Sequence, residues 1–335
     1  MRGYVLGIDL GGTKIEAAVV DGRGRIIGRG RGKTEAWRSE EEVFDRIVRM
    51  ARRAIESAEI DEHQLAALGV GTPGPLDPDT GYIIETANLP FRNFPLGPRL
   101  RETFGCPTAI QNDVDAAIYG EFRAGAAQGA KHVLGMFVGT GIGGGLVLNG
   151  SLYNGFGKNA GEIGHMIIEA RGPRCGCGRR GCLEALASRT AITRDLRKAI
   201  KNGQKTMLTR SYGKNLDELP SRALREAFDA NDKLVKRIVR RAARHLGIGL
   251  GSLVNVLSPQ IIVLGGGVIE AVGDEILDII YKWTRRTAFE FSMKGVKLVK
   301  SRLGDDAGVM GAAIIAHEAL EARQQVTHRT RRRSR

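Results

Sequence analysis

The chain has 335 residues, 42% hydrophobic and 26% charged, a globular composition with room for about two domains. No apolar run approaches the roughly 18 residues of a membrane helix, and the N-terminal residues resemble a strand rather than a secretory signal. We therefore expect a cytoplasmic protein with no membrane partner.

The formal net charge is +14, and part of it comes from a basic tail at residues 326–335, VTHRTRRRSR. Such a run could bind nucleic acid, but aromatic residues are only 5% of the chain and none lies among these arginines. We expect no nucleic-acid partner and a solvated, disordered tail.

The N-terminus predicts a β meander around a glycine turn. A β-rich run over 4–9 meets Gly11-Gly12-Thr13, and further runs cover 14–20 and 25–28. Glycines let backbone N–H groups approach an anion, and the threonine hydroxyl can donate to it. With Lys14 this stretch partly matches a P-loop, but the full P-loop glycine spacing is missing and a strand rather than a helix follows. A tight hairpin without a ligand is the alternative.

Helical and short β segments follow. Residues 39–57 form an amphipathic helix with Ser39 and Glu42 as a capping box. A short strand over 65–71 breaks into the rigid loop 72–75, and another over 108–111 runs into Asn112-Asp113 and a helix. That pair alone would indicate a helix cap.

Residues 133–153 repeat the meander, with a strand entering Gly139-Thr140-Gly141, a strand at 145–148 and an Asn-Gly turn. Gly139, Gly141 and Gly144 fit the dinucleotide spacing, but they open a hairpin rather than a helix, which argues against a nicotinamide cofactor. Two copies of one unit predict two related α/β domains facing one another, with a nucleotide held between them.

The remaining elements are helices around one strand. A long helix over 233–257 contains three glycines, which suggests close backbone packing. A buried strand over 260–264 runs into Gly265-Gly266-Gly267, and an amphipathic helix covers 307–324. The predicted domains are 1–112 with about 308–325, and 113–307 with a zinc-binding insertion.

Three of the four cysteines, Cys175, Cys177 and Cys182, lie close together, with His165 ten positions upstream of the first. A Cys-x-Cys pair closes too short a loop for an unstrained disulfide, and a reducing compartment disfavours one. The Cys₃His set suits tetrahedral zinc, and four protein ligands leave no open position, so the metal would be structural. A reduced cysteine cluster is the alternative, and Cys106 is expected to be a core thiol.

Polar residues beside strand ends and glycine turns carry the expected chemistry: Asp9, Asn112, Asp113, Glu162, His165 and Glu184. Phosphoryl transfer needs a metal carboxylate, donors around the phosphates and a residue that deprotonates the acceptor hydroxyl. Asp9 suits the Mg²⁺ side, through water, and Asp113 can take a proton from an alcohol.

The ensemble resembles the ROK (repressor, open reading frame, kinase) sugar kinases, which have the actin-like ATPase (ribonuclease H-like) fold. The resemblance runs from Gly7-Ile8-Asp9-Leu10-Gly11-Gly12-Thr13-Lys14 to Gly304-Asp305-Asp306-Ala307-Gly308. Its most specific pieces are Asn112-Asp113 with Ala116-Ala117 and Gly120-Glu121, the 139–145 turn, Gly161-Glu162-Ile163-Gly164-His165, and Cys175-x-Cys177-Gly178-x-x-Gly181-Cys182-x-Glu184.

The resemblance implies a role for each matching position. Asp113 is the catalytic base for the sugar 6-hydroxyl. The implied sugar ligands are Asn112, Glu162, His165 and Glu184, with Gly74 and Asn88 on the substrate loop. The implied ATP and Mg²⁺ side comprises Asp9, Gly11, Gly12, Thr13, Lys14, Thr140 and Gly141, with Gly266 and Gly267 near the adenosine. Zinc on His165, Cys175, Cys177 and Cys182 would fix the segment carrying Glu184 and orient His165.

One position departs from the family pattern: Asp115 stands where an asparagine is usual, and a second carboxylate near the base could raise its pKa or alter sugar preference. The resemblance implies hexose and ATP as substrates and a homodimer or higher oligomer. Glucose is the expected acceptor, because the cysteine motif resembles that of the family's glucokinases. Fructose, mannose, N-acetylglucosamine and N-acetylmannosamine stay open.

Two other classes are disfavoured. A sugar-responsive repressor would carry a helix-turn-helix of about 60–80 residues before the first glycine turn, and Asp9 comes only eight residues after Met1. A filament-forming actin relative would need neither the zinc set nor the Glu/His/Glu sugar ligands.

Overall fold

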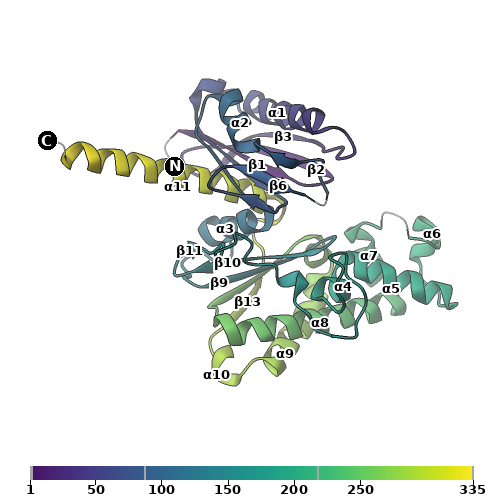
Figure 1. Ribbon diagram of the computed structural model, residues 1–335. Helices are drawn as coiled ribbons and strands as arrows, with labels where there is room; N and C mark the ends of the chain where they lie inside the picture. The colour runs from purple at the N-terminus through teal and green to yellow at the C-terminus, as the bar shows by residue number, and fades with distance from the viewer. Residues whose placement is uncertain (1–2, 87, 217–218, 334–335) are drawn as a thin grey trace. The chain divides into compact units, whose positions relative to one another are not determined.

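The computed structural model describes residues 3–86, 88–216 and 219–333. Contacts divide the chain into two compact units: residues 1–129, 152–160 and 305–335 form unit 1, and residues 130–151 and 161–304 form unit 2. Each unit combines a five-stranded mixed sheet with helices, as Figure 1 shows, so the predicted α/β class is confirmed. Among the described residues, no helix has the length and apolarity to cross a bilayer.

The sheet of unit 1 has the order β3-β2-β1-β4-β8. Its strands are β1 (Tyr4–Leu10), β2 (Lys14–Val20), β3 (Ile26–Lys33), β4 (Leu65–Thr72) and β8 (Thr108–Asn112). The meander β1-β2-β3 is antiparallel, whereas β4 runs parallel to both β1 and β8. The carboxyl ends of β1, β4 and β8 therefore share one edge, where ligand sites are built in such sheets.

Helix α1 (Glu40–Ser57) covers one face of this sheet (Figure 1). Its predicted capping box is present: Ser39 Oγ accepts from the Glu42 N–H, and the Glu42 carboxylate accepts from the Ser39 N–H. Eight apolar side chains of α1 are buried against the sheet. The short 3₁₀ helix η1 (Glu62–Gln64) then leads into β4.

The opposite face carries α3 (Asp113–Ala124) and α11 (Ala307–Arg333) (Figure 1). Glycines let α11 approach both β4 and α3 closely. A Cβ on Gly69 of β4 would lie 1.9 Å from the Ala312 carbonyl oxygen of α11, and a Cβ on Gly311 of α11 would lie 1.7 Å from the Ala116 carbonyl oxygen of α3. This packing places α3 in unit 1, so the observed boundary follows Gly129, whereas the sequence analysis placed it after residue 112.

The C-terminal helix extends further than the sequence pattern indicated. The amphipathic pattern ends at residue 324, but α11 continues to Arg333. The helix therefore enters the stretch 326–335 for which the sequence predicts disorder, and residues 334–335 lie outside the described part of the chain.

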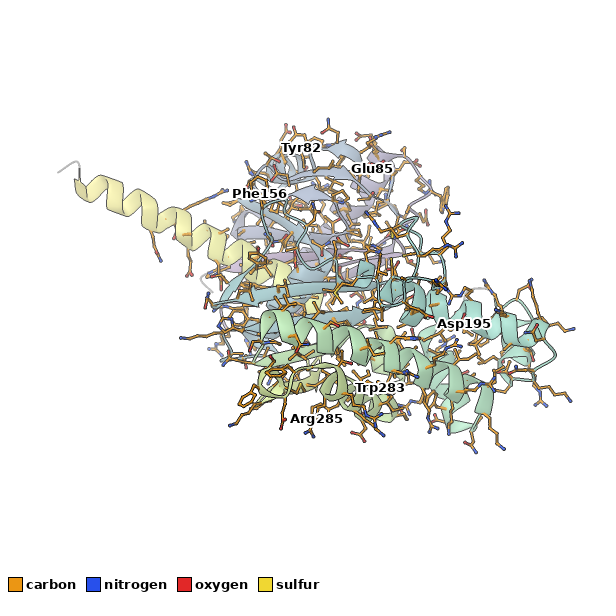
Figure 2. The ribbon with its side chains drawn as sticks, turned by 60° about the horizontal axis from the view of Figure 1, so that its bottom comes forward. Tyr82, Glu85, Phe156, Asp195, Trp283 and Arg285 are labelled. Carbon is orange, nitrogen blue, oxygen red and sulfur yellow. The ribbon has the colours of Figure 1, made fainter. Side chains whose placement is uncertain are left out.

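A small subsheet completes unit 1, with β5 (Leu76–Asp77), β6 (Tyr82–Glu85) and β7 (Arg92–Phe94), followed by α2 (Leu96–Phe104). The segment 152–160 contacts both sheets of unit 1. Gln111 Nε2 of β8 donates to Asn154 Oδ1 at 3.3 Å, and Lys158 Nζ lies 2.7 Å from Oδ2 of Asp79, which follows β5. Tyr82 and Phe156 project from unit 1 in Figure 2. No periodic signal in the sequence predicted this subsheet.

Unit 2 repeats the strand plan of unit 1. Its sheet has the order β11-β10-β9-β12-β13, built from β9 (Val133–Val138), β10 (Ile142–Leu148), β11 (Ser151–Leu152), β12 (Ile261–Gly265) and β13 (Lys297–Lys300). Strand β10 is antiparallel to β9, and β12 is parallel to β9, as β2 and β4 are to β1. The predicted duplication is therefore visible in the topology.

The helices of unit 2 lie after and between these strands. They are α4 (Leu183–Ala187), α5 (Arg189–Lys201), α6 (Leu208–Tyr212), α7 (Ser221–Asp229), α8 (Lys233–Leu257), α9 (Gly267–Thr287) and α10 (Glu290–Met293), with the 3₁₀ turn η2 (Ile163–His165). A further 3₁₀ turn, η3 (Gly304–Asp306), spans the boundary between the two units. The close packing predicted from the α8 glycines is confirmed, because a Cβ on Gly247 would lie 2.5 Å from the Ile280 carbonyl oxygen of α9.

Candidate active site

The first glycine turn joins β1 to β2 and is held by its own backbone. The Gly11 N–H donates to the Lys14 carbonyl at 2.9 Å, and Thr34 Oγ1 donates to the Gly11 carbonyl at 2.6 Å. Gly12 packs on Asn88, since an added Cβ would come within 3.0 Å of the Asn88 Cβ and carbonyl oxygen. The turn thus brings a residue of the predicted substrate loop beside Gly12, with Thr13 exposed to solvent.

Asp9 lies at the end of β1 in an acidic environment. Burial, and then the negative charges of Asp113 and Glu16, raise its pKa from 3.8 to about 7. Lys14 opposes the shift only partly, because its Nζ lies 3.5 Å from Glu16 and 3.7 Å from the exposed Asp305. A half-buried carboxylate among other carboxylates fits a divalent cation, whose charge would favour the ionised form.

Asn112 and Asp113 mark the junction of β8 and α3. Asn112 Oδ1 accepts from the N–H groups of Val114 at 3.0 Å and Asp115 at 3.3 Å, so Asn112 is an N-cap. Asp113 Oδ1 accepts from the Val114 N–H at 2.9 Å, and its side chain is half-buried. The prediction of a helix cap is thus confirmed for Asn112. Asp113 is the first residue of α3, so its carboxylate lies at the N-terminal end of the helix.

Two further positions surround this junction. An added Cβ on Gly74 would lie 4.0 Å from Asn112 Nδ2, which puts the predicted loop glycine beside the cap. Asp115 is only 3% exposed, so its carboxylate is turned into the packing of α3 rather than toward solvent.

The second glycine turn joins β9 to β10 in unit 2, and an arginine that the sequence analysis did not predict contacts it. The Arg189 N–H donates to the Gly139 carbonyl at 2.9 Å, and Arg189 Nη2 donates to Thr140 Oγ1 at 2.6 Å. Thr190 Oγ1 also donates to the Thr140 carbonyl at 2.7 Å. No motif marks this arginine, because α5 brings it to Thr140 from 49 residues further along the chain.

Gly266 and Gly267 lie at the same edge of this sheet. Gly266 has φ +83°, and an added Cβ would come within 2.8 Å of the Val138 backbone at the end of β9. Gly267 begins α9 beside Ser221 Oγ. The predicted adenosine loop and the predicted phosphate turn are therefore neighbours, because β12 and β9 are adjacent parallel strands.

Glu184 and His165 form a compact polar group next to the second turn. Glu184 Oε2 accepts from the Ile142 N–H at 3.0 Å and occupies the space over Gly141, where a Cβ would come within 2.4 Å. His165 Nε2 lies 3.8 Å from the exposed Glu162 carboxylate, and its Nδ1 lies 3.7 Å from Cys175 Sγ. One ring nitrogen thus faces the cysteines and the other faces the predicted sugar ligands.

His165, Cys175, Cys177 and Cys182 offer four ligand atoms that lie within 4.8 Å of one another. Cys177 Sγ is 3.7 Å from Cys182 Sγ and no disulfide forms; a tetrahedron with Zn–S bonds of about 2.3 Å has sulfur–sulfur edges of about 3.8 Å. The Arg179 N–H lowers the pKa of Cys177 to about 7, which favours a thiolate ligand, whereas burial raises that of Cys175 to about 12. Donor types and spacing both fit structural zinc.

The structure therefore gathers the predicted residues into two sets. Unit 1 holds Asp9, Gly11, Gly12, Thr13, Lys14, Gly74, Asn88, Asn112 and Asp113, and unit 2 holds Thr140, Gly141, Glu162, His165, Glu184, Gly266, Gly267 and the three zinc-motif cysteines. Duplicated sheets with a glycine turn after the first strand of each define an actin-like ATPase fold.

The sequence pattern of the ROK family matches residues 5–319, and the chain belongs to that family. It is 35% identical to a glucokinase of Halalkalibacterium halodurans, over 92% of this chain and 93% of that protein. A crystal structure of a ROK family glucokinase from Streptomyces griseus in complex with glucose and AMPPNP superposes with a TM-score of 0.82 at 32% identity, covering 94% of this chain and all of that one. A putative xylose repressor of a Caldicellulosiruptor species is 28% identical over 92% of this chain and 77% of its own length.

Proposed function

We propose that the protein is an ATP-dependent kinase that phosphorylates the 6-hydroxyl of glucose. The observation that carries the proposal is the half-buried carboxylate of Asp113 at the junction of β8 and α3, close enough to Asp9 to raise its pKa. Similarity to glucokinases over most of both chains supports the same reaction.

In this proposal Asp113 is the catalytic base. Its carboxylate accepts the proton of the 6-hydroxyl while that oxygen bonds to the γ-phosphorus of ATP, and the bond to the bridging oxygen breaks to release ADP. The Val114 N–H bonds to one carboxylate oxygen, Oδ1, which fixes the orientation of the group at the head of α3. Asn112 supports the base by ending the strand and capping the helix.

Both glycine turns are proposed to bind the phosphates of the nucleotide, one from each unit. Gly11, Gly12, Thr13 and Lys14 would bind phosphate oxygens in unit 1, and Thr140 and Gly141 would do so in unit 2. Mg²⁺, held through Asp9 and water, would neutralise charge on the phosphates. Gly266 and Gly267 leave room for the adenosine because neither carries a side chain beside the β9 backbone.

Glu162, His165 and Glu184 are proposed to bind sugar hydroxyls. The cysteine contact on Nδ1 leaves His165 Nε2 for a hydroxyl, and the Ile142 N–H holds one Glu184 oxygen while Oε1 stays near the zinc set. Zinc would then stabilise the sugar site without contacting the sugar.

Glucose is the proposed acceptor, and other hexoses and N-acetylhexosamines test that choice. A coupled assay of ADP release over glucose, fructose, mannose, N-acetylglucosamine and N-acetylmannosamine should give the highest kcat/KM with glucose. Higher kcat/KM with another sugar would reassign the substrate, and no ADP release with any of them would contradict the kinase.

We also place the reaction in the cytoplasm, where ATP is supplied and thiols stay reduced, and propose a homodimer. Val256, Phe289 and Phe291 of unit 2 are 79%, 65% and 78% exposed, an apolar patch of the kind that a second copy covers. Light scattering after size exclusion measures the mass directly; a monomer at micromolar concentration would contradict the dimer.

A further inference from the structure

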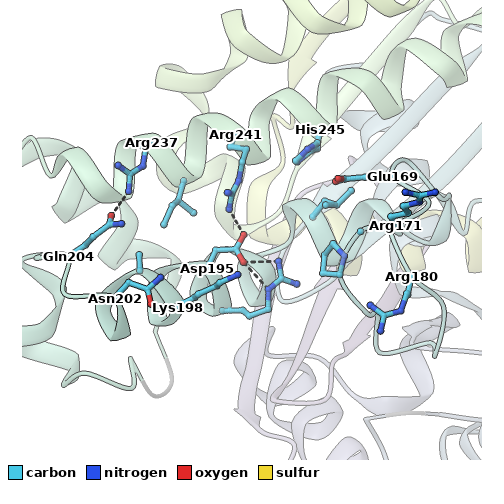
Figure 3. A pocket seen from close by; sticks show the side chains of 16 residues that line it. Glu169, Arg171, Arg180, Asp195, Lys198, Asn202, Gln204, Arg237, Arg241 and His245 are labelled. Carbon is cyan, nitrogen blue, oxygen red and sulfur yellow. Dashed lines mark hydrogen bonds and ion pairs between the residues drawn. The ribbon is translucent and has the colours of Figure 1, made fainter.

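A cavity of about 880 Å³ opens in unit 2 between α5, α8 and the segment 169–180 (Figure 3). Its volume is typical of small-molecule sites. None of the residues proposed above for sugar, nucleotide or zinc lines it. It therefore requires its own explanation.

The lining is strongly basic, with six cationic side chains against two carboxylates. Asp195 forms ion pairs with two of the cations. Arg194 lies 2.8 Å from Asp195 Oδ1, and Arg241 pairs with Asp195 Oδ2 (Figure 3). Arg171, Arg180 and Lys198 form no ion pair with any of the described residues. The cavity thus has positive charge that the surrounding protein does not neutralise.

One residue of the cavity wall also has a buried polar atom without a partner. His245 lines the cavity from α8, and its Nδ1 is buried without a hydrogen-bond partner among the described residues. Burial lowers the pKa of His245, which favours the neutral ring. A buried ring nitrogen without a partner is stabilised when a ligand or water supplies one.

We propose that this cavity binds a small phosphorylated molecule through Arg171, Arg180 and Lys198, with His245 as a further polar contact. Guanidinium groups match phosphate oxygens in pairs, and several cations lining one cavity favour a dianion over a singly charged group.

The cavity is connected to the proposed sugar site, so the consequence for catalysis rests on the proposed function. Arg194 Nη1 donates to the Ala185 carbonyl at 2.8 Å, and Ala185 follows Glu184 in α4. Leu186 of the same helix lines the cavity. A phosphate that competes with Asp195 for Arg194 would shift α4 and with it Glu184, which should change the KM for sugar rather than kcat.

Binding is tested on the zinc-loaded full chain by calorimetry in 150 mM salt, without ATP or Mg²⁺. The probes are inorganic phosphate and fructose 1,6-bisphosphate, which is not a product of the proposed reaction. We expect saturable binding of the bisphosphate, weakened at least 10-fold by the double change Arg180→Gln, Lys198→Gln and unchanged by the control Lys282→Gln on α9. Circular dichroism checks the fold, and Arg171→Gln replaces the double variant if that variant does not fold.

Several results would overturn the proposal: no saturable binding of either probe, equal binding by the double variant, or citrate binding as tightly as the bisphosphate. Tighter binding of a 20-base-pair DNA duplex that the bisphosphate cannot displace would assign the basic surface to nucleic acid instead. None of these results depends on turnover, so they are separate from a failure to phosphorylate glucose.

Discussion

The two glycine turns follow the same strand plan but differ in their electrostatic environment. The turn after β1 lies beside Asp9 and Glu16, and the charge of Asp113 reaches Asp9. The turn after β9 also has one carboxylate beside it, Glu184 over Gly141, but it is contacted by Arg189, whose guanidinium donates to Thr140. A duplicated backbone has therefore acquired a side suited to a cation and a side suited to an anion.

This difference bears on the proposed reaction. A magnesium-bound triphosphate presents a divalent cation together with phosphate oxygens, and one turn alone cannot offer favourable charge to both. Changes on the acidic side should affect the metal and the proton, and changes on the basic side should affect binding of the nucleotide.

The largest effect is expected on the acidic side, from Asp113→Asn. The amide cannot accept the hydroxyl proton, so kcat should fall by about 10³-fold or more while sugar binding survives. Rapid-quench measurement of ADP formation checks the fall in kcat, and calorimetry with glucose checks that sugar binding survives.

The matched control is Asp115→Asn, which introduces the asparagine usual in the family at a buried position two residues away. Its kcat should stay within a few-fold of the parent. An active Asp113→Asn enzyme would remove Asp113 from the role of base.

Loss of zinc should abolish the support of the sugar ligands in unit 2. Cys177→Ser removes one of the four ligands, so we expect about one zinc per chain in the parent, little in the variant, and lower stability and activity together. Emission spectrometry measures the zinc content and thermal unfolding measures the stability. Cys106→Ser is the control, because Cys106 lies outside the four candidate zinc ligands. A parent that folds and turns over without zinc contradicts a structural metal.

Asp9→Asn should separate stability from catalysis. Because folding raises the Asp9 pKa from 3.8 to about 7, the folded state holds a proton that the unfolded state releases, and stability falls as pH rises from about 4 to about 7. Removing this charge should stabilise the magnesium-free protein above pH 7 by up to about 4 kcal/mol, while kcat/KM for ATP falls about 100-fold.

Urea unfolding at pH 5 and pH 8 tests the stability change, with exposed Asp305→Asn as a control that should change little. If the parent and Asp9→Asn show the same pH dependence, the raised pKa is contradicted.

The sequence predicted the parts of this fold that depend on short-range signals. The capping box at Ser39, the glycine turns and the hairpin topology follow from local spacing. The boundary at Gly129 was not predictable in this way, because it depends on α3 packing against α11, almost 200 residues later in the chain.

The same limit applies to the site. The four candidate zinc ligands and Asp113 stand in recognisable motifs, whereas Arg189 reaches Thr140 only after α5 has folded against the sheet. The basic cavity has lining residues from 169 to 245 with no common motif, so only the tertiary structure brings them together.

The smallest effect is expected on the basic side, from Arg189→Gln. The shorter amide loses the charge and the 2.6 Å bond to Thr140 Oγ1, but the backbone bond from residue 189 to Gly139 remains and should preserve the turn. We expect the KM for ATP to rise about 10-fold with little change in kcat or in the KM for glucose, because one charged contact to phosphate contributes on the order of 1–2 kcal/mol. Exposed Arg222→Gln in the first turn of α7 should leave all three constants unchanged. If Arg189→Gln lowered kcat but left the KM for ATP unchanged, the arginine would act on the transferring phosphoryl group, and the division between an acidic and a basic turn would no longer separate catalysis from nucleotide binding.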